Sequence, residues 1–480
     1  MRRDVADRPS KLGHPRLTRV HREWAWRRAA RRYALGTLGC GPARAPADPP
    51  GGRHRRALLA EYQTLDTSRH TIYEVNVRQF TPEGTFDALR AHLPRLADLG
   101  VSILWLMPIH PIGTVRRKGS LGSYYAVRDY TAVNPEFGTR AAFERLVRAA
   151  HGLGLLVILD WVANHTAWDH VWTETDPERY ARDADGESIL PEPDWDDVIN
   201  LDYDEPSTGP AMIEAMLHWV REFDVDGFRC DVAERVPAEF WSRAMAQLRA
   251  ERPLFMLAEG ERTWLHRAGF DATYGWGLAR AIEAATRTGV AAPIRAQVEE
   301  DSRVLGGACP SAFRMQFTTN HDWNSWEQTA VDRFGPALEL ATVLTFTLPG
   351  MPMIYGGQEG GLDRPLAFFE RDPIVWADAP LAALYRRLVR LKASEPALAH
   401  GAEGGAIEFL DLAKSPSVLA YVRRSAASEV LVLANLAASA VALERVAASP
   451  HRRYVDLEGS ATELPEGLEA WQAVVLVRRG

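Results

Sequence analysis

From Thr71 onward, short apolar runs alternate with stretches whose apolar residues recur at helical spacing. Between the first two runs, for example, the spacing predicts a helix over Thr85–Leu99, with Gly100 as its stop. Such alternation is typical of β–α units and a parallel sheet. Eight runs are candidate strands: Ile72–Val77, Val101–Met107, Leu155–Leu159, Gly227–Cys230, Leu254–Ala258, Ala272–Tyr274, Arg314–Phe317 and Met353–Tyr355. Eight strands with intervening helices predict a (β/α)₈ TIM barrel.

Two segments depart from this alternation. The stretch from Trp161 to about Pro206 is rich in Asp, Glu, Pro and Trp, and we interpret it as a short, loop-rich insertion after the third strand. Excursions at strand ends often shape a site. After about Ala402 the pattern becomes strand-like: Ala406–Leu412, Val418–Arg424, Glu429–Leu436, Ala440–Val446 and Ala473–Val477. We therefore predict an α/β fold with a catalytic barrel over residues 57–400 and a C-terminal all-β sandwich over residues 401–480.

Charge divides the chain unevenly. Over 480 residues the formal net charge is −7. Met1–Arg56 holds 15 Lys or Arg against 4 Asp or Glu, so the rest of the chain carries a net negative charge. Phosphate contacts need clustered cationic side chains, so an acidic body argues against a nucleic-acid partner. The negative net charge of this part of the chain is more compatible with a neutral ligand than with a nucleic acid.

The basic segment Met1–Arg56 shows little apolar periodicity, and we interpret it as a disordered arm. Within it, the stretch from Arg31 to Cys40 resembles a twin-arginine export signal, but its apolar part is short. A cytoplasmic location is therefore our first expectation, and export is the alternative. No apolar run reaches the ~18 residues that cross a bilayer. Three cysteines imply no disulfide framework.

Four acidic residues stand at or soon after predicted strand ends: Asp160, Asp231, Glu259 and Asp322. In a TIM barrel the carboxyl ends of the strands surround a single site. One such acid could be a helix cap, but four in this position are difficult to explain as caps. We therefore expect these carboxylates to lie together.

Arg229 and Asp231 are two residues apart on a strand, so their side chains point the same way and can meet. We expect the guanidinium to hold Asp231 ionised, as a nucleophile requires. Glu259 follows an apolar strand, where desolvation and nearby carboxylates would raise its pKa and keep it protonated as an acid. A structural ion pair is the alternative for Arg229 and Asp231. Glu261 is the rival acid to Glu259.

These segments resemble the α-amylase family of glycoside hydrolases, over roughly Ile72 to Trp376. The motifs that carry the resemblance are Asp160-Trp161-Val162-Ala163-Asn164-His165, Gly227-Phe228-Arg229-Cys230-Asp231, Leu257-Ala258-Glu259 and Asn320-His321-Asp322, in the family's order. The resemblance implies that Asp231 is the nucleophile, Glu259 the acid/base and Asp322 the transition-state stabiliser.

The resemblance also implies a set of substrate-binding residues. Tyr125 matches the tyrosine that stacks under the sugar at the cleavage subsite, and His165 and His321 match histidines that hydrogen-bond this sugar. Asp160 matches the residue that steadies the nucleophile–arginine pair and the substrate hydroxyl groups, and Arg229 is the arginine of that pair. Asn164 matches a position that often binds structural calcium. The chemistry itself implies no required cofactor.

We therefore expect a retaining glycosidase that hydrolyses α-glucosidic bonds of starch-type or maltooligosaccharide substrates by double displacement. One alternative keeps the site but changes the acceptor, which gives a maltosyl- or glucanotransferase, a phosphorylase or a trehalose-type isomerase. A second alternative is a catalytically silent carbohydrate-binding relative. Such proteins usually lose catalytic acids, whereas all three are present here.

Overall fold

The computed structural model describes residues 65–479, apart from residues 308, 377–380, 412–413 and 444–453. The predicted arm, Met1–Arg56, lies outside the described residues, and so does the start of the predicted barrel domain at residues 57–64. Within the part that is described, no helix is long and apolar enough to cross a membrane.

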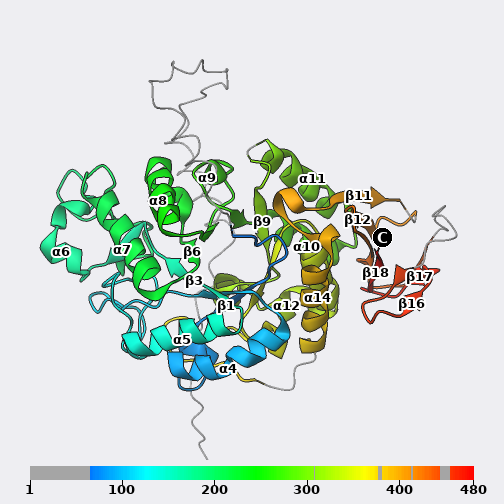
Figure 1. Cartoon of the computed structure of the whole chain (residues 1–480), viewed down its shortest axis with the longest axis horizontal. Coiled ribbons are helices and arrows are strands. Elements are labelled where there is room, and N and C mark those ends of the chain that lie inside the picture. The colour runs from blue at the N-terminus through cyan, green and yellow to red at the C-terminus, as the bar shows by residue number, and fades with distance from the viewer. Residues whose placement is uncertain (1–64, 308, 377–380, 412–413, 444–453, 480) are drawn as a thin grey trace, which may run out of the picture. The chain divides into compact units, whose positions relative to one another are not determined.

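Eight parallel strands close into a barrel in the order β1-β10-β9-β8-β7-β6-β3-β2 (Figure 1). They are β1 (Ile72–Val75), β2 (Ile103–Leu106), β3 (Leu156–Trp161), β6 (Gly227–Cys230), β7 (Phe255–Ala258), β8 (Ala272–Tyr274), β9 (Phe313–Gln316) and β10 (Met351–Tyr355). The predicted TIM barrel and its eight strands are confirmed, with ends that shift by a residue or two. The first strand ends early because Val77 already belongs to a helical turn, α3 (Val77–Phe80).

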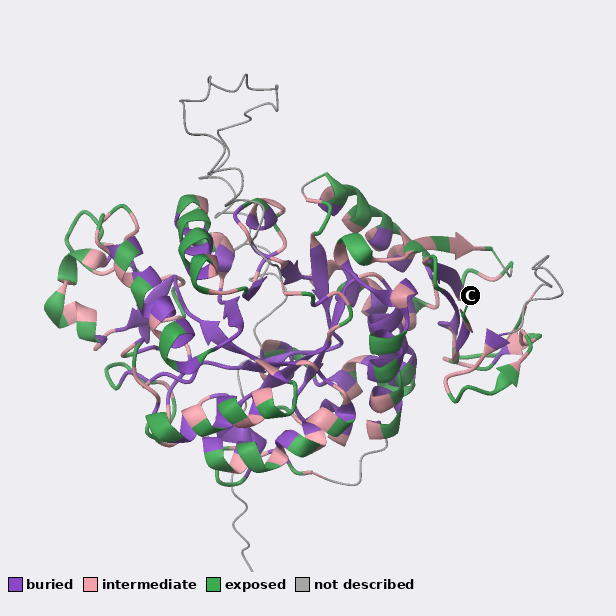
Figure 2. Cartoon of the chain, viewed as in Figure 1, coloured by how far each residue is buried: buried purple, intermediate pink, exposed green. Residues whose placement is uncertain are grey.

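Helices follow the strands and cover the outside of the barrel, where their outer faces are exposed (Figure 2). The longer ones are α4 (Phe86–Leu99), α5 (Arg140–Gly152), α7 (Thr208–Phe223), α8 (Ala238–Glu251), α10 (Trp276–Thr288), α11 (Ala292–Gly306), α13 (Leu338–Thr347) and α14 (Ala382–Ser394). The short ones are α9 (Trp264–Arg267) and α12 (Ala330–Phe334). Single turns and one π-helix complete the connections: η2 (Ala233–Arg235), η3 (Trp323–Glu327, the π-helix), η4 (Gly335–Ala337), η5 (Gln358–Gly360), η6 (Pro396–Leu398) and η7 (Gly401–Glu403).

Helix α4 shows how the sequence pattern produces this layer. The Thr85 side chain accepts a hydrogen bond from the Ala88 amide and caps the helix start, while Gly100 ends the helix in the left-handed conformation. The apolar positions of its inner face are all buried: Phe86, Leu89, Leu93, Leu96 and Leu99. Each such side chain contributes about 1.5–3 kcal/mol by leaving water. The helix predicted over Thr85–Leu99 is thus confirmed.

The insertion after the third strand has little regular structure. It contains β4 (His165–Ala167), α6 (Val171–Thr175), η1 (Pro177–Arg179) and β5 (Val198–Asn200). Strands β4 and β5 pair antiparallel, with His165 opposite Asn200. The insertion therefore returns to the barrel close to the point where it left.

The C-terminal region is all-β, as predicted. Its main antiparallel sheet has the order β11-β12-β13-β18-β15-β16, and β14 and β17 form a separate pair. The strands are β11 (Ala406–Leu410), β12 (Val418–Arg424), β13 (Ser428–Asn435), β14 (Val441–Ala442), β15 (Tyr454–Val455), β16 (Ala461–Thr462), β17 (Gly467–Leu468) and β18 (Ala473–Arg479). The change from helices to antiparallel strands falls between α14 and β11, while the boundary at residues 400–401 stays a prediction.

The sheet packs on the barrel through specific polar contacts. The hydroxyls of Thr347, at the end of α13, and Tyr421, on β12, lie 2.6 Å apart. Arg423 is buried and donates to the carbonyl oxygens of Thr347 (3.2 Å) and Ala399 (3.1 Å). These bonds satisfy polar groups that would otherwise be buried without partners.

Candidate active site

The predicted acids meet at the carboxyl ends of the barrel strands. Strand β3 runs through Asp160, which is the register partner of Arg229 on β6, so the two side chains emerge side by side. Ladder-like bonds continue past the strand ends, from the Asp231 amide to the Trp161 carbonyl and from the Glu259 amide to the Cys230 carbonyl, both 2.9 Å. Asp231 and Glu259 therefore have backbone positions set by the barrel rather than by free loops.

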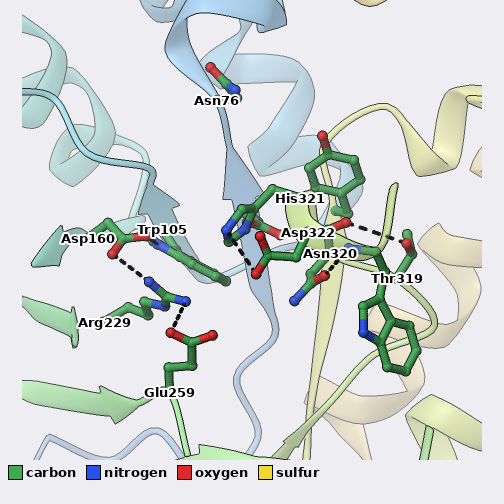
Figure 3. A network of polar contacts seen from close by, with 12 residues as sticks. Asn76, Trp105, Asp160, Arg229, Glu259, Thr319, Asn320, His321 and Asp322 are labelled. Carbon is green, nitrogen blue, oxygen red and sulfur yellow. Dashed lines mark hydrogen bonds and ion pairs between the residues drawn. The ribbon is translucent and has the colours of Figure 1, made fainter. Parts of the chain in front are cut away.

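The Arg229 guanidinium is the centre of the site (Figure 3). Its Nη1 lies 2.8 Å from Asp160 Oδ1 and 2.9 Å from Asp231 Oδ1, and its Nη2 lies 2.9 Å from Glu259 Oε2. Glu259 Oε2 also accepts a 2.7 Å hydrogen bond from the Val232 amide. One guanidinium thus brings three carboxylates from three strands into contact.

Aromatic residues surround the guanidinium and exclude water from it. Arg229 is fully buried, its Cζ lies 5.1 Å from the Trp105 ring centroid, and its Nε donates to the Tyr274 hydroxyl at 3.1 Å. The Trp105 Nε1 donates to Asp160 Oδ2 at 3.1 Å. In such a dry setting the ion pairs are much stronger than in water.

A second cluster joins the first through Tyr125. Its hydroxyl donates to Asp160 Oδ2 at 3.1 Å and lies 2.8 Å from His321 Nε2. His321 Nδ1 lies 2.5 Å from Glu74 Oε1, and Asp322 Oδ2 lies 3.5 Å from its Nε2. Burial alone would lower the pKa of His321, but the carboxylates of Asp322 and Glu74 raise it to about 9. The ring is therefore cationic at neutral pH.

The acids differ in their tendency to hold a proton. Burial raises the pKa of Asp160 and of Asp231 to about 6, although Arg229 lowers both. Burial, reinforced by Asp231 and Asp322, raises the pKa of Glu259 to about 7 against the opposing effect of Arg229. Arg229 lowers the pKa of Asp231, as the predicted pairing requires, but desolvation outweighs the pairing, so this pKa stays above its usual value. The pKa of Asp231 is still below that of Glu259, so there is a pH range in which Asp231 is ionised while Glu259 keeps its proton.

We expect activity to depend on pH in a narrow bell shape. Asp231 becomes ionised as the pH rises through about 6, and Glu259 loses its proton as the pH rises through about 7, so activity should peak between these values. The profile of kcat/KM against pH for a maltooligosaccharide checks this. A profile that stays flat well above the pKa of Glu259 would contradict the assignment of the acid.

Two predicted residues stand apart from this network. His165 begins β4; its Nδ1 lies 3.2 Å from Asn164 Nδ2, its ring packs 5.6 Å from that of Trp195, and burial lowers its pKa to about 3. Asn164 also donates to Asn200 Oδ1 at 3.1 Å. None of these contacts of Asn164 involves a carboxylate, and the described residues hold no group of three or more His, Cys, Asp or Glu side chains suited to a metal. Calcium binding at Asn164 stays a prediction.

Glu261, the alternative to Glu259 as the acid, contacts the start of α10. Glu261 Oε1 accepts a hydrogen bond from the Gly277 amide at 3.0 Å, at the start of α10. Cys230 is buried beside the site. Aromatic faces can stack on the apolar faces of sugar rings. Trp161 and Trp323 are buried, whereas Trp326 is half exposed. Trp326 is thus the better placed of these three to touch a substrate.

Sequence reasoning missed Glu74, Trp105 and Tyr274, which touch the predicted residues from β1, β2 and β8. Tyr274 and Trp105 resemble ordinary core residues in the sequence. Glu74 does carry a signal, because an acid inside a buried strand needs a partner. Its partner, His321, lies 247 residues away, so only the closed barrel reveals the pair.

Comparisons with known proteins agree with this geometry. A family model described as the α-amylase catalytic domain matches residues 61–188. The α-amylase MalA of Haloarcula japonica is 29% identical over 384 residues, covering 76% of this chain and 55% of the relative. An α-1,4-glucan:maltose-1-phosphate maltosyltransferase of Streptomyces coelicolor is 27% identical over 429 residues, covering 80% and 59%.

A solved structure matches over nearly its whole length. The α-amylase from Lactobacillus plantarum is 30% identical, with a TM-score of 0.75, and the match covers 86% of this chain and 99% of that one. The chain belongs to the α-amylase family of glycoside hydrolases. It spans less than two thirds of the length of the two curated relatives named above.

Proposed function

We propose that the chain is an enzyme that cleaves α-glucosidic bonds of starch-type glucans or maltooligosaccharides with retention of configuration. The observation that carries the proposal is the single guanidinium of Arg229 in contact with Asp160, Asp231 and Glu259. Carboxylates this close suit a double displacement, for which a separation of about 5–5.5 Å between nucleophile and acid/base is typical.

In the first step, Glu259 gives its proton to the glycosidic oxygen while an Asp231 oxygen attacks the anomeric carbon. The bond between that carbon and the oxygen breaks, the reducing-end portion leaves as an alcohol, and a β-glycosyl ester remains on Asp231. In the second step, Glu259 takes a proton from water, and the hydroxide attacks the same carbon. The ester bond breaks, and an α-configured product leaves.

The other residues hold the sugar through these steps. We assign Asp322, His321, Asp160 and Tyr125 to the hydroxyl groups and ring face of the sugar at the cleavage point, with Arg229 steadying the two reacting acids. Donors and charges that are already in place cost no reorganisation during the reaction. His165 keeps its assignment to the sugar, and a substrate complex would test it.

Proton NMR of fresh products from a maltooligosaccharide tests this proposal. Initial release of the α-anomer is expected, whereas the β-anomer would contradict double displacement. The resemblance to a maltosyltransferase favours one other outcome. Products longer than the starting sugar would keep the mechanism and make a second sugar, rather than water, the acceptor. A protein that binds the sugar and leaves it intact would be a silent relative.

Glu259→Gln should lower the rate on natural glucan by about 10²–10⁴-fold, because an amide cannot protonate the leaving oxygen. Substrates with an activated leaving group, such as 2,4-dinitrophenyl α-glucosides or maltosides, need no such proton and should lose far less. Parallel kinetics on both substrate types measure the difference. Glu261→Gln, two residues along the chain, is the matched control and should leave both rates nearly unchanged. Equal losses on the two substrates would contradict the role of Glu259.

A cytoplasmic location remains part of the proposal. Fractionation of the source cells, followed by immunodetection, tests it against export.

A further inference from the structure

The closed barrel sets the direction in which a bound glucan lies. In the ring of eight strands, β1 stands opposite β7, the strand that leads into Glu259. The acid protonates the leaving oxygen, so it stands on the reducing-end side of the bond that breaks. With Glu259 on the reducing-end side, the proposed mechanism places the sugars on the non-reducing side toward β1 and its two neighbours, β2 and β10.

Two loops join over that side of the barrel. The loop after β2 and the loop after β10 are bonded through Gly119–Leu121 and Phe368–Glu370, which we call the mouth latch. The Leu121 amide donates to the Phe369 carbonyl at 3.1 Å, and the Ser120 amide donates to Glu370 Oε1 at 2.9 Å. The Ser120 hydroxyl also donates to Glu370 Oε2. Loops from two neighbours of β1 thus form one continuous wall.

The latch rests on a buried arginine that follows β1. Arg78 has a fully buried side chain, and it donates to the carbonyls of Gly122 at 3.1 Å and Leu121 at 3.2 Å. Its Nε also pairs with Glu136 at 3.0 Å. A buried guanidinium with all these partners holds its loop firmly, because breaking any bond leaves a buried polar group unpaired.

The wall is close-packed and continues to the catalytic residues. A Cβ on Gly119, whose φ is +60°, would lie 2.5 Å from the Phe369 Cβ, so the two loops leave no gap at that point. Phe368 stacks on the Tyr125 ring with 6.3 Å between centroids, and Trp326 packs on Phe368 at 5.2 Å. The wall therefore begins directly beside the tyrosine assigned to the sugar at the cleavage point.

We propose that the mouth latch closes the non-reducing side of the site, so that the enzyme attacks chain ends and releases short products instead of cutting within the chain. This inference rests on the proposed function and specifies its substrate as a free non-reducing end of an α-glucan. A glucan that continues past the cleavage point on that side meets the wall formed by Phe368, Phe369 and the Gly119–Leu121 loop.

The test uses p-nitrophenyl maltoheptaoside with a free or an ethylidene-blocked non-reducing end, with products separated by chromatography. The wild-type chain should release glucose or maltose first from the free substrate and should leave the blocked one nearly intact. Comparable initial rates on the two substrates, or first products from the middle of the chain, would overturn the inference while leaving the proposed function standing. Inactivity on both would overturn the proposed function, and this inference with it.

Removing the side-chain contacts of the mouth latch tests whether the latch causes the preference for chain ends. The Ser120→Ala/Glu370→Ala double variant removes the two side chains that bridge the loops, and it should raise the ratio of blocked to free rates by at least about tenfold. Glu222→Ala is the control, because Glu222 is a surface carboxylate that also forms an ion pair, with Arg140 on the outer helices. The control should keep the wild-type ratio. An unchanged ratio in the double variant, with its rate on the free substrate retained, would show that the mouth latch does not set the specificity. A double variant that is inactive on both substrates would also contradict the inference, since neither residue touches the reacting groups.

Discussion

Replacing Asp231 by Asn is expected to reduce turnover by about 10⁴-fold or more while the protein keeps its fold. The amide has nearly the shape of the carboxylate, and its oxygen can still accept the 2.9 Å hydrogen bond from Arg229. It has no negative charge with which to attack the anomeric carbon, so the covalent step fails. Steady-state kinetics on a maltooligosaccharide measures the loss, and circular dichroism checks the fold.

Asp224→Asn is the matched control for this substitution. Asp224 ends α7 in the left-handed conformation, which Asn adopts readily, and its side chain is 78% exposed. The control should keep wild-type turnover and melting temperature. A folded Asp231→Asn protein that turns over within about tenfold of wild type would remove Asp231 from the role of nucleophile.

Arg229→Met should have the largest effect on stability, with a loss of about 3–5 kcal/mol in the free energy of unfolding. Methionine keeps much of the volume but leaves Asp160, Asp231 and Glu259 without their shared cation in a buried site. Urea unfolding at neutral pH measures the loss. Activity should fall too, since without Arg229 the pKa of Asp231 rises further and less of the nucleophile is ionised.

The pH dependence of this loss follows from the sign of the pKa shifts. The three carboxyls have raised pKa values already, and removal of the cation raises them more. A folded protein that binds protons more tightly than the unfolded chain gains stability as the pH falls. The deficit of Arg229→Met should therefore shrink in mild acid. Arg221→Met, which breaks exposed pairs with Glu214 and Glu251, is the control and should change stability by well under 1 kcal/mol. An Arg229→Met protein as stable as this control would contradict the buried network.

The strands and the central acids could be predicted because their signals are local. The apolar run that leads into Glu259 needs no knowledge of the fold, and two-residue spacing alone places Arg229 beside Asp231. The common end of the parallel strands then brings Asp160 into the group, as the register of β3 and β6 confirms. Their catalytic roles remain predictions until the variants are measured.

Other parts could not be predicted, because they depend on distant segments. The Leu121–Phe369 bond joins loops that lie almost 250 residues apart, and neither loop has a sequence motif that indicates a partner. The pKa of Asp231 depends on how completely the barrel removes water from it, which spacing along a strand does not report. The Glu74–His321 pair could not be predicted either, because the sequence indicates that a buried Glu74 needs a partner but does not indicate that the partner is His321.

The sharing of one arginine among three carboxylates also means that the covalent step changes the site's charge. Before reaction, the charge on Asp231 raises the pKa of Glu259. Once Asp231 is esterified to the sugar, that charge is gone and the pKa of Glu259 falls. Having given up its proton, Glu259 then stays ionised at neutral pH and can accept a proton from the incoming water. The switch from acid to base needs no movement of the side chain, because formation and hydrolysis of the ester set its timing.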